Sequence, residues 1–282
     1  MENFVNKAAV VTGGASGIGL SLARRALAEG MKVVIVDIEQ TALDDAVSDL
    51  NGGKNVLGMC VDVRDGGAMQ ALADEVEQRF GPAALLFNNA GVGGGGLAWE
   101  ASEEDWDWVL GVNLRGVING LRAFVPQMIA SGEGHIINTA SIAGLVSAPG
   151  TCTYTVSKHA VVALSEVLSG DLRNQGANVG VSVLCPSFVA TRIYASDRNR
   201  GHELTVEEAA EQAAVQEMVA EFFKGATSPD TVADLVFQSV INGQFYILPQ
   251  PLGSVPLIEQ RMNGIVENTP PIMTGPEEYP AQ

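Results

Sequence analysis

A short apolar run that leads directly into a glycine-rich turn stands near the start of the chain. Residues 7–11 read Lys-Ala-Ala-Val-Val, which is typical of a buried strand, and an apolar helical pattern begins after residue 19. Between them lies Thr12-Gly-Gly-Ala-Ser-Gly-Ile-Gly19. A strand that ends in glycines and continues as a helix leaves backbone N–H groups free at the helix N-terminus, where they attract phosphate. This order predicts an α/β fold with a phosphate-binding turn after its first strand.

The glycine spacing is a variant of the commonest dinucleotide-binding pattern, G-x-G-x-x-G. Here it is Gly13-xxx-Gly17-x-Gly19, with Ser16 and Ile18 between the glycines. Glycine suits such a turn because a Cβ would block both the tight backbone and the close approach of a pyrophosphate. A plain tight turn is the alternative interpretation. The position after a strand and before a helix favours the dinucleotide.

Strand and helix patterns alternate along the rest of the chain, which predicts a parallel sheet covered by helices on both faces. No composition shift marks a linker and no internal repeat is visible, so we expect one domain over residues 1–282. This is a Rossmann-type, doubly wound sheet of about seven strands. Further strands are expected over residues 32–36, 55–63, 83–87, 135–141, 179–184 and 245–248, and helices over residues 41–50, 66–80, 102–128, 154–174 and 229–241.

Two segments depart from this alternation. Residues 187–228 follow a strand, and Thr205 with Glu208 forms a capping box for a helix to about Phe223. Since open α/β sheets bind ligands at the carboxyl ends of their strands, we interpret this insertion as a substrate lid, with a surface helix as the alternative. The extension 249–282 holds seven of the twelve prolines. We expect it to wrap the surface, close the pocket or touch a neighbouring subunit.

The chain of 282 residues is strongly acidic, with a formal net charge of −17. We therefore expect neither nucleic acid nor a membrane as a partner. Three separated cysteines without C-x-x-C spacing indicate neither a metal site nor a disulfide framework, and they fit a reducing compartment. We expect a cytoplasmic protein without a signal peptide, because the first strand begins almost at once. No apolar run approaches the roughly 20 residues of a membrane span.

Asp37 ends the second predicted strand, eighteen residues after Gly19. A carboxylate at this place can accept hydrogen bonds from both hydroxyls of an adenosine ribose and would repel a 2′-phosphate. No lysine or arginine stands beside it, since Ile38 and Glu39 follow. The sequence therefore favours NAD over NADP, although an ordinary strand-end aspartate is the alternative.

Three residues that can take part in catalysis lie at the end of a predicted strand or at the start of a predicted helix: Ser141, Tyr154 and Lys158. Tyr154 and Lys158 are four residues apart and share one helix face. A tyrosine hydroxyl titrates near 10, and a neighbouring ammonium stabilises the phenolate; lowering that pKa by three units represents about 4 kcal/mol. Ser141 can hydrogen-bond a substrate oxygen that gains or loses a proton. A strand-end cap, a surface aromatic and a solvated charge are the structural alternatives.

These motifs together resemble the short-chain dehydrogenase/reductase family. The matches appear in the family's order and cover about two-thirds of the chain, from Val10 to Thr191. One departure stands after the sixth strand, where many members have Pro-Gly and this chain has Pro186-Ser187. The matching residues are Thr12 to Gly19, Asp62-Val63, Asn88-Asn89-Ala90-Gly91, Asn113, Ser141, Tyr154-xxx-Lys158, Pro186 and Thr191.

The resemblance implies a catalytic tetrad of Asn113, Ser141, Tyr154 and Lys158. Tyr154 would be the acid/base, Ser141 would orient the substrate oxygen, and Lys158 would hold the nicotinamide ribose and lower the pKa of Tyr154. Asn113 would sit at a helix irregularity and anchor a proton-relaying water. The resemblance also implies further cofactor contacts, with Asp62 at the adenine, Asn89 in the adenosine ribose region, and Val189 and Thr191 at the nicotinamide amide. Val63, Ala90, Gly91 and Pro186 complete the expected cofactor-binding residues.

The leading functional hypothesis is an NAD-dependent enzyme that interconverts a secondary alcohol and a ketone. A hydrophobic, cyclic or aromatic substrate is indicated by an apolar set of candidate lining residues, although these could serve the core instead. The rivals are an NADP-dependent carbonyl reductase and a non-catalytic dinucleotide sensor or scaffold. Relatives usually form dimers or tetramers, so we expect a homodimer or homotetramer through the apolar runs 117–125 and 160–168. The candidate lining residues are Leu145, Val146, Pro149, Ile193, Tyr194, Met218 and Phe222.

Overall fold

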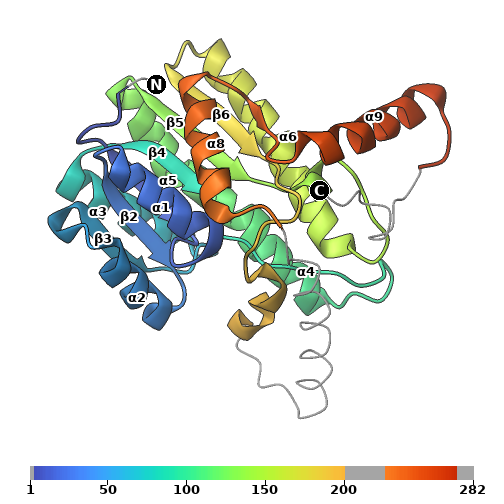
Figure 1. The fold of residues 1–282 in the computed structure, drawn as a ribbon, viewed down its shortest axis with the longest axis horizontal. Helices are drawn as coiled ribbons and strands as arrows, with labels where there is room; N and C mark the ends of the chain where they lie inside the picture. The colour runs from blue at the N-terminus through green and yellow to red at the C-terminus, as the bar shows by residue number, and fades with distance from the viewer. Residues whose placement is uncertain (1–2, 201–225, 272–282) are drawn as a thin grey trace.

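The computed structural model describes residues 3–200 and 226–271. Its described residues form one parallel sheet of seven strands in the order β3-β2-β1-β4-β5-β6-β7 (Figure 1). The expected doubly wound α/β architecture is confirmed. The strands are β1 (Ala8–Thr12), β2 (Lys32–Asp37), β3 (Val56–Cys60), β4 (Ala83–Asn88), β5 (Gly134–Thr139), β6 (Val179–Leu184) and β7 (Tyr246–Ile247).

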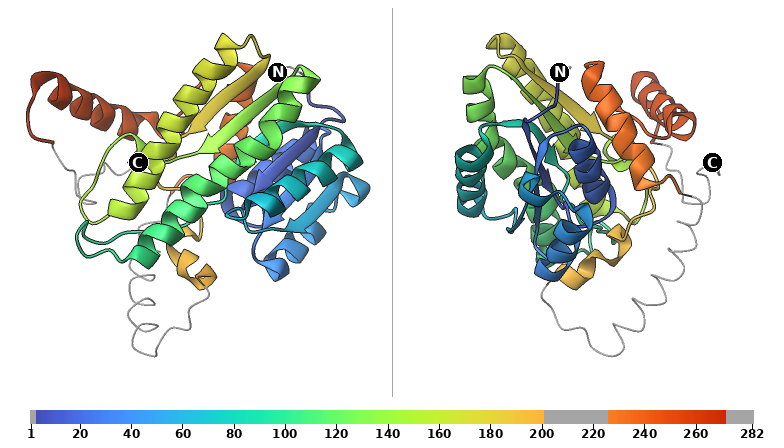
Figure 2. Two further views of the ribbon diagram at one scale, coloured as in Figure 1. Left: turned by 180° about the vertical axis from the view of Figure 1, so that it is seen from behind. Right: turned by 60° about the vertical axis from the view of Figure 1, so that its left-hand side comes forward.

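Helices cover both faces of the sheet (Figure 2). One apolar core joins the sheet to α1 (Gly17–Ala28), α2 (Gln40–Leu50) and α8 (Pro229–Ile241). The other joins it to α3 (Gly66–Phe80), α5 (Gly116–Ser131) and α6 (Cys152–Asn174). The central strands read as continuous apolar runs because both of their faces are buried. Short 3-10 turns lie at Gly53–Asn55 (η1), Ile142–Gly144 (η3) and Ile193–Asn199 (η4).

The helix expected over residues 102–128 is interrupted. It begins as α4 (Glu103–Leu110), with Ser102 and Asp105 forming the capping box, and continues as α5 after a π-helical turn at Gly111–Arg115 (η2). Such turns often mark functional sites. Asn113 lies within this turn, as the family resemblance implied for a helix irregularity.

The C-terminal extension contains a helix that the sequence analysis did not predict, α9 (Pro251–Glu267). Two prolines lie in this helix. Pro251 occupies the first helical position, where a missing N–H costs nothing, whereas Pro256 lies inside the helix. Of its residues only Ser254 is buried, and the helix projects from the body of the molecule (Figure 1).

Several boundaries also shift. The third and fifth strands end earlier than expected, at Cys60 and Thr139, so Asp62 and Ser141 lie just beyond the sheet. The expected lid helix, with Thr205 and Glu208, lies outside the described residues. Across residues 3–200 and 226–271, no helix combines the length and apolar character needed to cross a bilayer.

Candidate active site

The turn between β1 and α1 is built by close backbone packing. Gly13 and Gly17 have φ values of +63° and +52°, which favour glycine. A Cβ on Gly19 would lie 2.0 Å from the carbonyl oxygen of Gly13, and one on Gly13 would lie 2.9 Å from the Cα of Ala90. The predicted residues Gly13, Ser16, Gly17 and Ile18 line the pocket, whereas Gly19 packs beneath the turn. This tight backbone cradle fits the pyrophosphate of a dinucleotide.

Asp37 lines the same pocket at the end of β2 and is tied to the glycine turn. Its Oδ2 accepts a hydrogen bond from Ala15 N at 3.1 Å, and its Oδ1 accepts one from Ile38 N at 2.8 Å. Asp62 and Val63 lie nearby in the lining. Burial acts to raise the pKa of Asp62, but hydrogen bonds from Arg64 outweigh it and hold that pKa below its usual range.

The chain after β4 forms the floor of the pocket, with Asn89, Ala90 and Gly91 in its lining. The hydroxyl oxygen of Thr12 accepts from the backbone N–H groups of Asn89 and Ala90, at 2.9 and 3.0 Å. A Cβ on Gly91 would lie 3.4 Å from both Asn113 Oδ1 and Lys158 Nζ. The floor of the pocket therefore passes close to two of the predicted catalytic residues.

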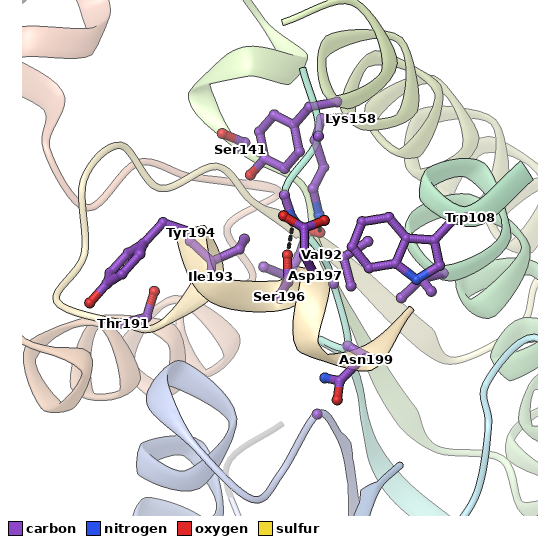
Figure 3. Close-up of a pocket in the computed structure, with 18 of the residues that line it drawn as sticks. Val92, Trp108, Ser141, Lys158, Thr191, Ile193, Tyr194, Ser196, Asp197 and Asn199 are labelled. Carbon is purple, nitrogen blue, oxygen red and sulfur yellow. Dashed lines mark hydrogen bonds between the residues drawn. The ribbon is translucent and has the colours of Figure 1, made fainter. Parts of the chain in front are cut away.

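The structure places Ser141, Tyr154 and Lys158 in one pocket with the glycine turn. Ser141 follows β5, while Tyr154 and Lys158 lie in the first two turns of α6. The ammonium of Lys158 is 5.6 Å from the centre of the Tyr154 ring and donates to Thr139 O at 3.0 Å. Figure 3 shows Ser141 and Lys158 on one side of the pocket, with Thr191 and Tyr194 apart from them on another.

The electrostatics differ from the sequence expectation for Tyr154. Burial raises the pKa of Tyr154, and the hydrogen bond with Ser141 opposes this without reversing it. Burial also lowers the pKa of Lys158 to about 8. The physical reason is that a low-dielectric pocket penalises the phenolate and the ammonium alike. In this structure the hydroxyl of Tyr154 therefore stays protonated at neutral pH.

Asn113 is fully buried and uses its side chain to connect three segments. Its Oδ1 accepts from Val92 N at 2.8 Å, and its Nδ2 donates to Val92 O and Ser157 Oγ, each at 3.0 Å. These bonds fix the π-helical turn against the floor of the pocket and against α6. A role in holding a proton-relaying water stays a prediction.

The chain after β6 forms the remaining wall, with Pro186, Val189 and Thr191 in the lining. Of the residues expected to form an apolar substrate site, four line the pocket: Val146, Pro149, Ile193 and Tyr194. Leu145 instead packs against the hydrophobic core, so its expected place in the site is wrong. Met218 and Phe222 lie outside the described residues.

Sequence reasoning missed the contacts that hold η4 across the cleft. Ser196 Oγ accepts from Gly93 N at 2.8 Å, and Arg198 pairs with Glu39 at 2.7 Å. Arg200 pairs with Asp105 and stacks over Trp108, 4.3 Å from the ring centre. No local spacing signals these contacts, because each joins residues about a hundred or more positions apart.

Gln250 is a second missed residue, and it is 8% exposed. Its side chain bonds to Ser187 and Phe188 in the pocket wall and to Thr227. The only cue in the sequence was the unusual Pro186-Ser187 pair that it contacts.

Comparison with known proteins agrees with this geometry. The profile of the short chain dehydrogenase family matches residues 7–201. A C alpha-dehydrogenase of Sphingobium sp. is 34% identical over 280 residues, covering 98% of this chain and 91% of the relative. A CLA biosynthesis dehydrogenase/reductase of Lactiplantibacillus plantarum is 33% identical over 278 residues, covering 96% of this chain and 97% of the relative.

A solved structure extends the likeness over nearly the whole chain. A short-chain dehydrogenase/reductase from Burkholderia phymatum, in complex with NAD, is 41% identical with a TM-score of 0.89. The match covers 98% of this chain and 99% of that one. The sequence, the parallel sheet and the relatives together place this chain in the short-chain dehydrogenase/reductase family of oxidoreductases.

Proposed function

We propose that this protein is an NAD-dependent dehydrogenase that interconverts a secondary alcohol and a ketone. The observation that carries the proposal is the presence of Ser141, Tyr154 and Lys158 in one pocket with the glycine turn. When bound, the nicotinamide would supply or accept the hydride at the carbinol carbon. Family membership supports a nicotinamide dinucleotide as the cofactor.

In this proposal Tyr154 transfers the proton of the substrate hydroxyl. Its raised pKa suits the direction of ketone reduction, in which a neutral phenol donates the proton. Ser141 would hydrogen-bond the same substrate oxygen, since its side chain already contacts Tyr154. Lys158 would bind the nicotinamide ribose, and its buried ammonium would help a phenolate to form in the direction of oxidation.

Asp37 supports the choice of NAD. Its carboxylate lines the pocket and is held by the turn that would bind the pyrophosphate. A 2′-phosphate at that place would meet a negative charge. The Burkholderia relative with NAD bound supports the same choice. The remaining predicted cofactor residues, Asp62, Val63, Asn89, Ala90, Gly91, Pro186, Val189 and Thr191, all line the pocket and would extend the cofactor site.

The lining favours a fairly hydrophobic substrate, such as a cyclic or aromatic secondary alcohol. Val146, Pro149 and Ile193 add apolar side chains to the pocket lining, and Tyr194 adds an aromatic ring. Burying such surface stabilises a bound apolar ligand by about 25 cal/mol per Å².

The test is formation of NADH or NADPH from a panel of secondary alcohols. We expect turnover with NAD, weaker turnover with NADP, and faster oxidation as the pH rises, because oxidation requires the phenolate of Tyr154. Tighter binding of NADPH than NADH would favour the NADP-dependent reductase. Tight NADH binding without turnover of any alcohol or ketone would favour the sensor.

We also propose a homodimer or homotetramer. Val156 and Val167 are exposed on α6, 48% and 61% respectively, and a second copy could bury them. Much of the run 117–125 instead lies in the core, with Val117 and Phe124 buried. Analytical ultracentrifugation tests this; a monomer at micromolar concentration would contradict it.

A further inference from the structure

Gln250 lies between β7 and α9, and its side chain joins its own segment to Thr227 and to the pocket wall that follows β6. Its Oε1 accepts from Ser187 N at 3.0 Å. Its Nε2 donates to Phe188 O at 3.1 Å and to Thr227 Oγ1 at 2.8 Å. This buried amide uses both of its N–H groups and its carbonyl oxygen in these bonds.

The first of these bonds acts on a peptide group that also contacts Ser141. The N–H of Ser187 and the carbonyl of Pro186 belong to one planar peptide unit, so fixing one end fixes the other. Pro186 O accepts from Ser141 Oγ at 3.4 Å and from Ile142 N at 2.8 Å. Gln250 and Ser141 therefore hold the two sides of the same peptide.

The two hydrogen bonds donated by Gln250 Nε2 restrain the residues on either side of the pocket wall, Phe188 and Thr227. Phe188 is the next residue of the same wall. Thr227 forms an isolated parallel β-bridge with Val189, the residue after Phe188. Ala190 N donates to Thr227 O at 3.0 Å. The Gln250 side chain thus fixes both the peptide that contacts Ser141 and the strand-like pair beside it.

A role in starting α9 does not explain this side chain. The contact of Gln250 with the helix is made by its backbone, since Ser254 N donates to Gln250 O at 3.0 Å. Any residue would offer that carbonyl. The three side-chain bonds all go to the pocket wall and to Thr227 instead.

We propose that Gln250 is a positioning residue for the reaction: it fixes the Pro186–Ser187 peptide and, through it, the hydroxyl of Ser141. The inference rests on the proposed function, in which Ser141 bonds the substrate oxygen. Small displacements of a group at the reacting centre cost up to about 100-fold in rate. Because Gln250 acts through one intermediate peptide, we expect a smaller loss.

The first experiment compares Gln250→Met with Gln244→Met, a matched change at an exposed glutamine just before β7. We expect kcat for a secondary alcohol to fall about 10-fold in Gln250→Met, with the Kd for NADH changed less than about twofold. Gln244→Met should match the wild type. Circular dichroism and the melting temperature establish that each variant is folded.

The second experiment distinguishes positioning from general support of the fold. In a Ser141→Ala background, Gln250→Met should lower kcat little further, because the group it positions is gone. If Gln250→Met does not fold, Gln250→Asn replaces it; the amide is kept but is one methylene too short to reach Ser187 N.

The outcomes separate the two proposals. A wild type that binds NADH but turns over no alcohol or ketone overturns the proposed function, and this inference with it. A wild type that turns over, with Gln250→Met equal to Gln244→Met, overturns the inference alone. Losses that multiply fully in the double variant with Ser141→Ala also overturn it.

Discussion

The two ends of the cleft are built in different ways. At the dinucleotide end, the backbone itself forms the surface: a Cβ on Gly19 or Gly13 would collide with neighbouring backbone. At the substrate end, side chains form the surface, with Ser141 from the chain after β5 and Tyr154 and Lys158 from the start of α6. The first end is fixed by close approach of chain to chain and the second by buried hydrogen bonds.

This difference indicates which substitutions should impair cofactor binding and which should impair turnover. A surface formed by backbone tolerates no added side chain, and apart from the carboxylate of Asp37 it depends little on the chemical identity of single side chains. A side-chain surface depends on the pKa and orientation of each group, and these are set by burial and by hydrogen-bond partners. The expectation is that variants at the two ends affect cofactor affinity and turnover separately.

Tyr154→Phe should give the largest effect and the clearest separation. Removing the hydroxyl that we propose transfers the proton should lower kcat by about 1,000-fold, within the range for general acid–base groups. The Kd for NADH, measured by fluorescence, should stay near the wild-type value. Tyr246→Phe is the control, because the Tyr246 hydroxyl bonds Glu166 away from the pocket. Parallel losses of NADH affinity and kcat would break the comparison between the two ends.

Gly19→Ala should show the reverse pattern. The added Cβ would lie 2.0 Å from Gly13 O, so the turn must shift. With an overpacking cost of about 2 kcal/mol, the Kd for NADH should rise about 30-fold, as titration would show. At saturating cofactor, kcat should stay within a few-fold of the wild type. Gly170→Ala is the control, since nothing lies within 4 Å of that Cβ. An unchanged Kd for NADH would show that the turn can accommodate the added Cβ without weakening cofactor binding.

The two ends also differ in how far the sequence alone predicts them. The turn from Gly13 to Gly19 and the strand before it are contiguous, so their local pattern carries the geometry. Tyr154 and Lys158 are likewise close in sequence and share a helix face. Gln250 could not be found this way, because its partners Ser187 and Phe188 are 63 and 62 residues away. Such a contact exists only once β6 and β7 pair.

Two other features were not predicted: the direction of the Tyr154 pKa shift and the helix α9. In the chain without cofactor, burial raises the pKa of Tyr154. Burial is not visible in a sequence, so the neighbouring lysine alone does not predict this direction. The helix α9 was not predicted because prolines disfavour helix in general. Pro251 stands at a position that tolerates it, but Pro256 lies inside the helix, so the local pattern does not indicate the helix. The fold itself was predicted because alternating apolar runs specify a covered parallel sheet.

Asp37→Asn sharpens the comparison within the dinucleotide end, where we propose that one side chain selects the cofactor. The change keeps the shape and an acceptor oxygen for Ala15 N but removes the charge that would repel a 2′-phosphate. The ratio of kcat/KM for NADP to that for NAD should rise about 10-fold, or about 1.4 kcal/mol. Asp44→Asn, an exposed site on α2, controls for net charge. An unchanged ratio would mean that Asp37 does not select the cofactor.

The smallest effect concerns His135, which lies in β5, the strand that leads to Ser141, but away from the cleft. It is buried, and its Nε2 forms a hydrogen bond with Ser182 Oγ at 2.8 Å. Burial lowers its pKa from 6.5 to about 4. Below pH 6.5 the unfolded chain therefore binds a proton that the folded chain refuses, so stability falls as the pH falls. At pH 6 this loss is about 0.8 kcal/mol and grows toward pH 4.

Urea unfolding at pH 7 and pH 6 tests this prediction with His135→Gln, which removes the titrating group and keeps a donor. The wild type should lose about 0.7 kcal/mol more than the variant between these pH values. The ratio of kcat at the two pH values should be the same in both proteins, because His135 lies outside the pocket lining. A pH-dependent difference in kcat would show that the strand transmits its charge state to Ser141, and the separation between stability and catalysis would then fail.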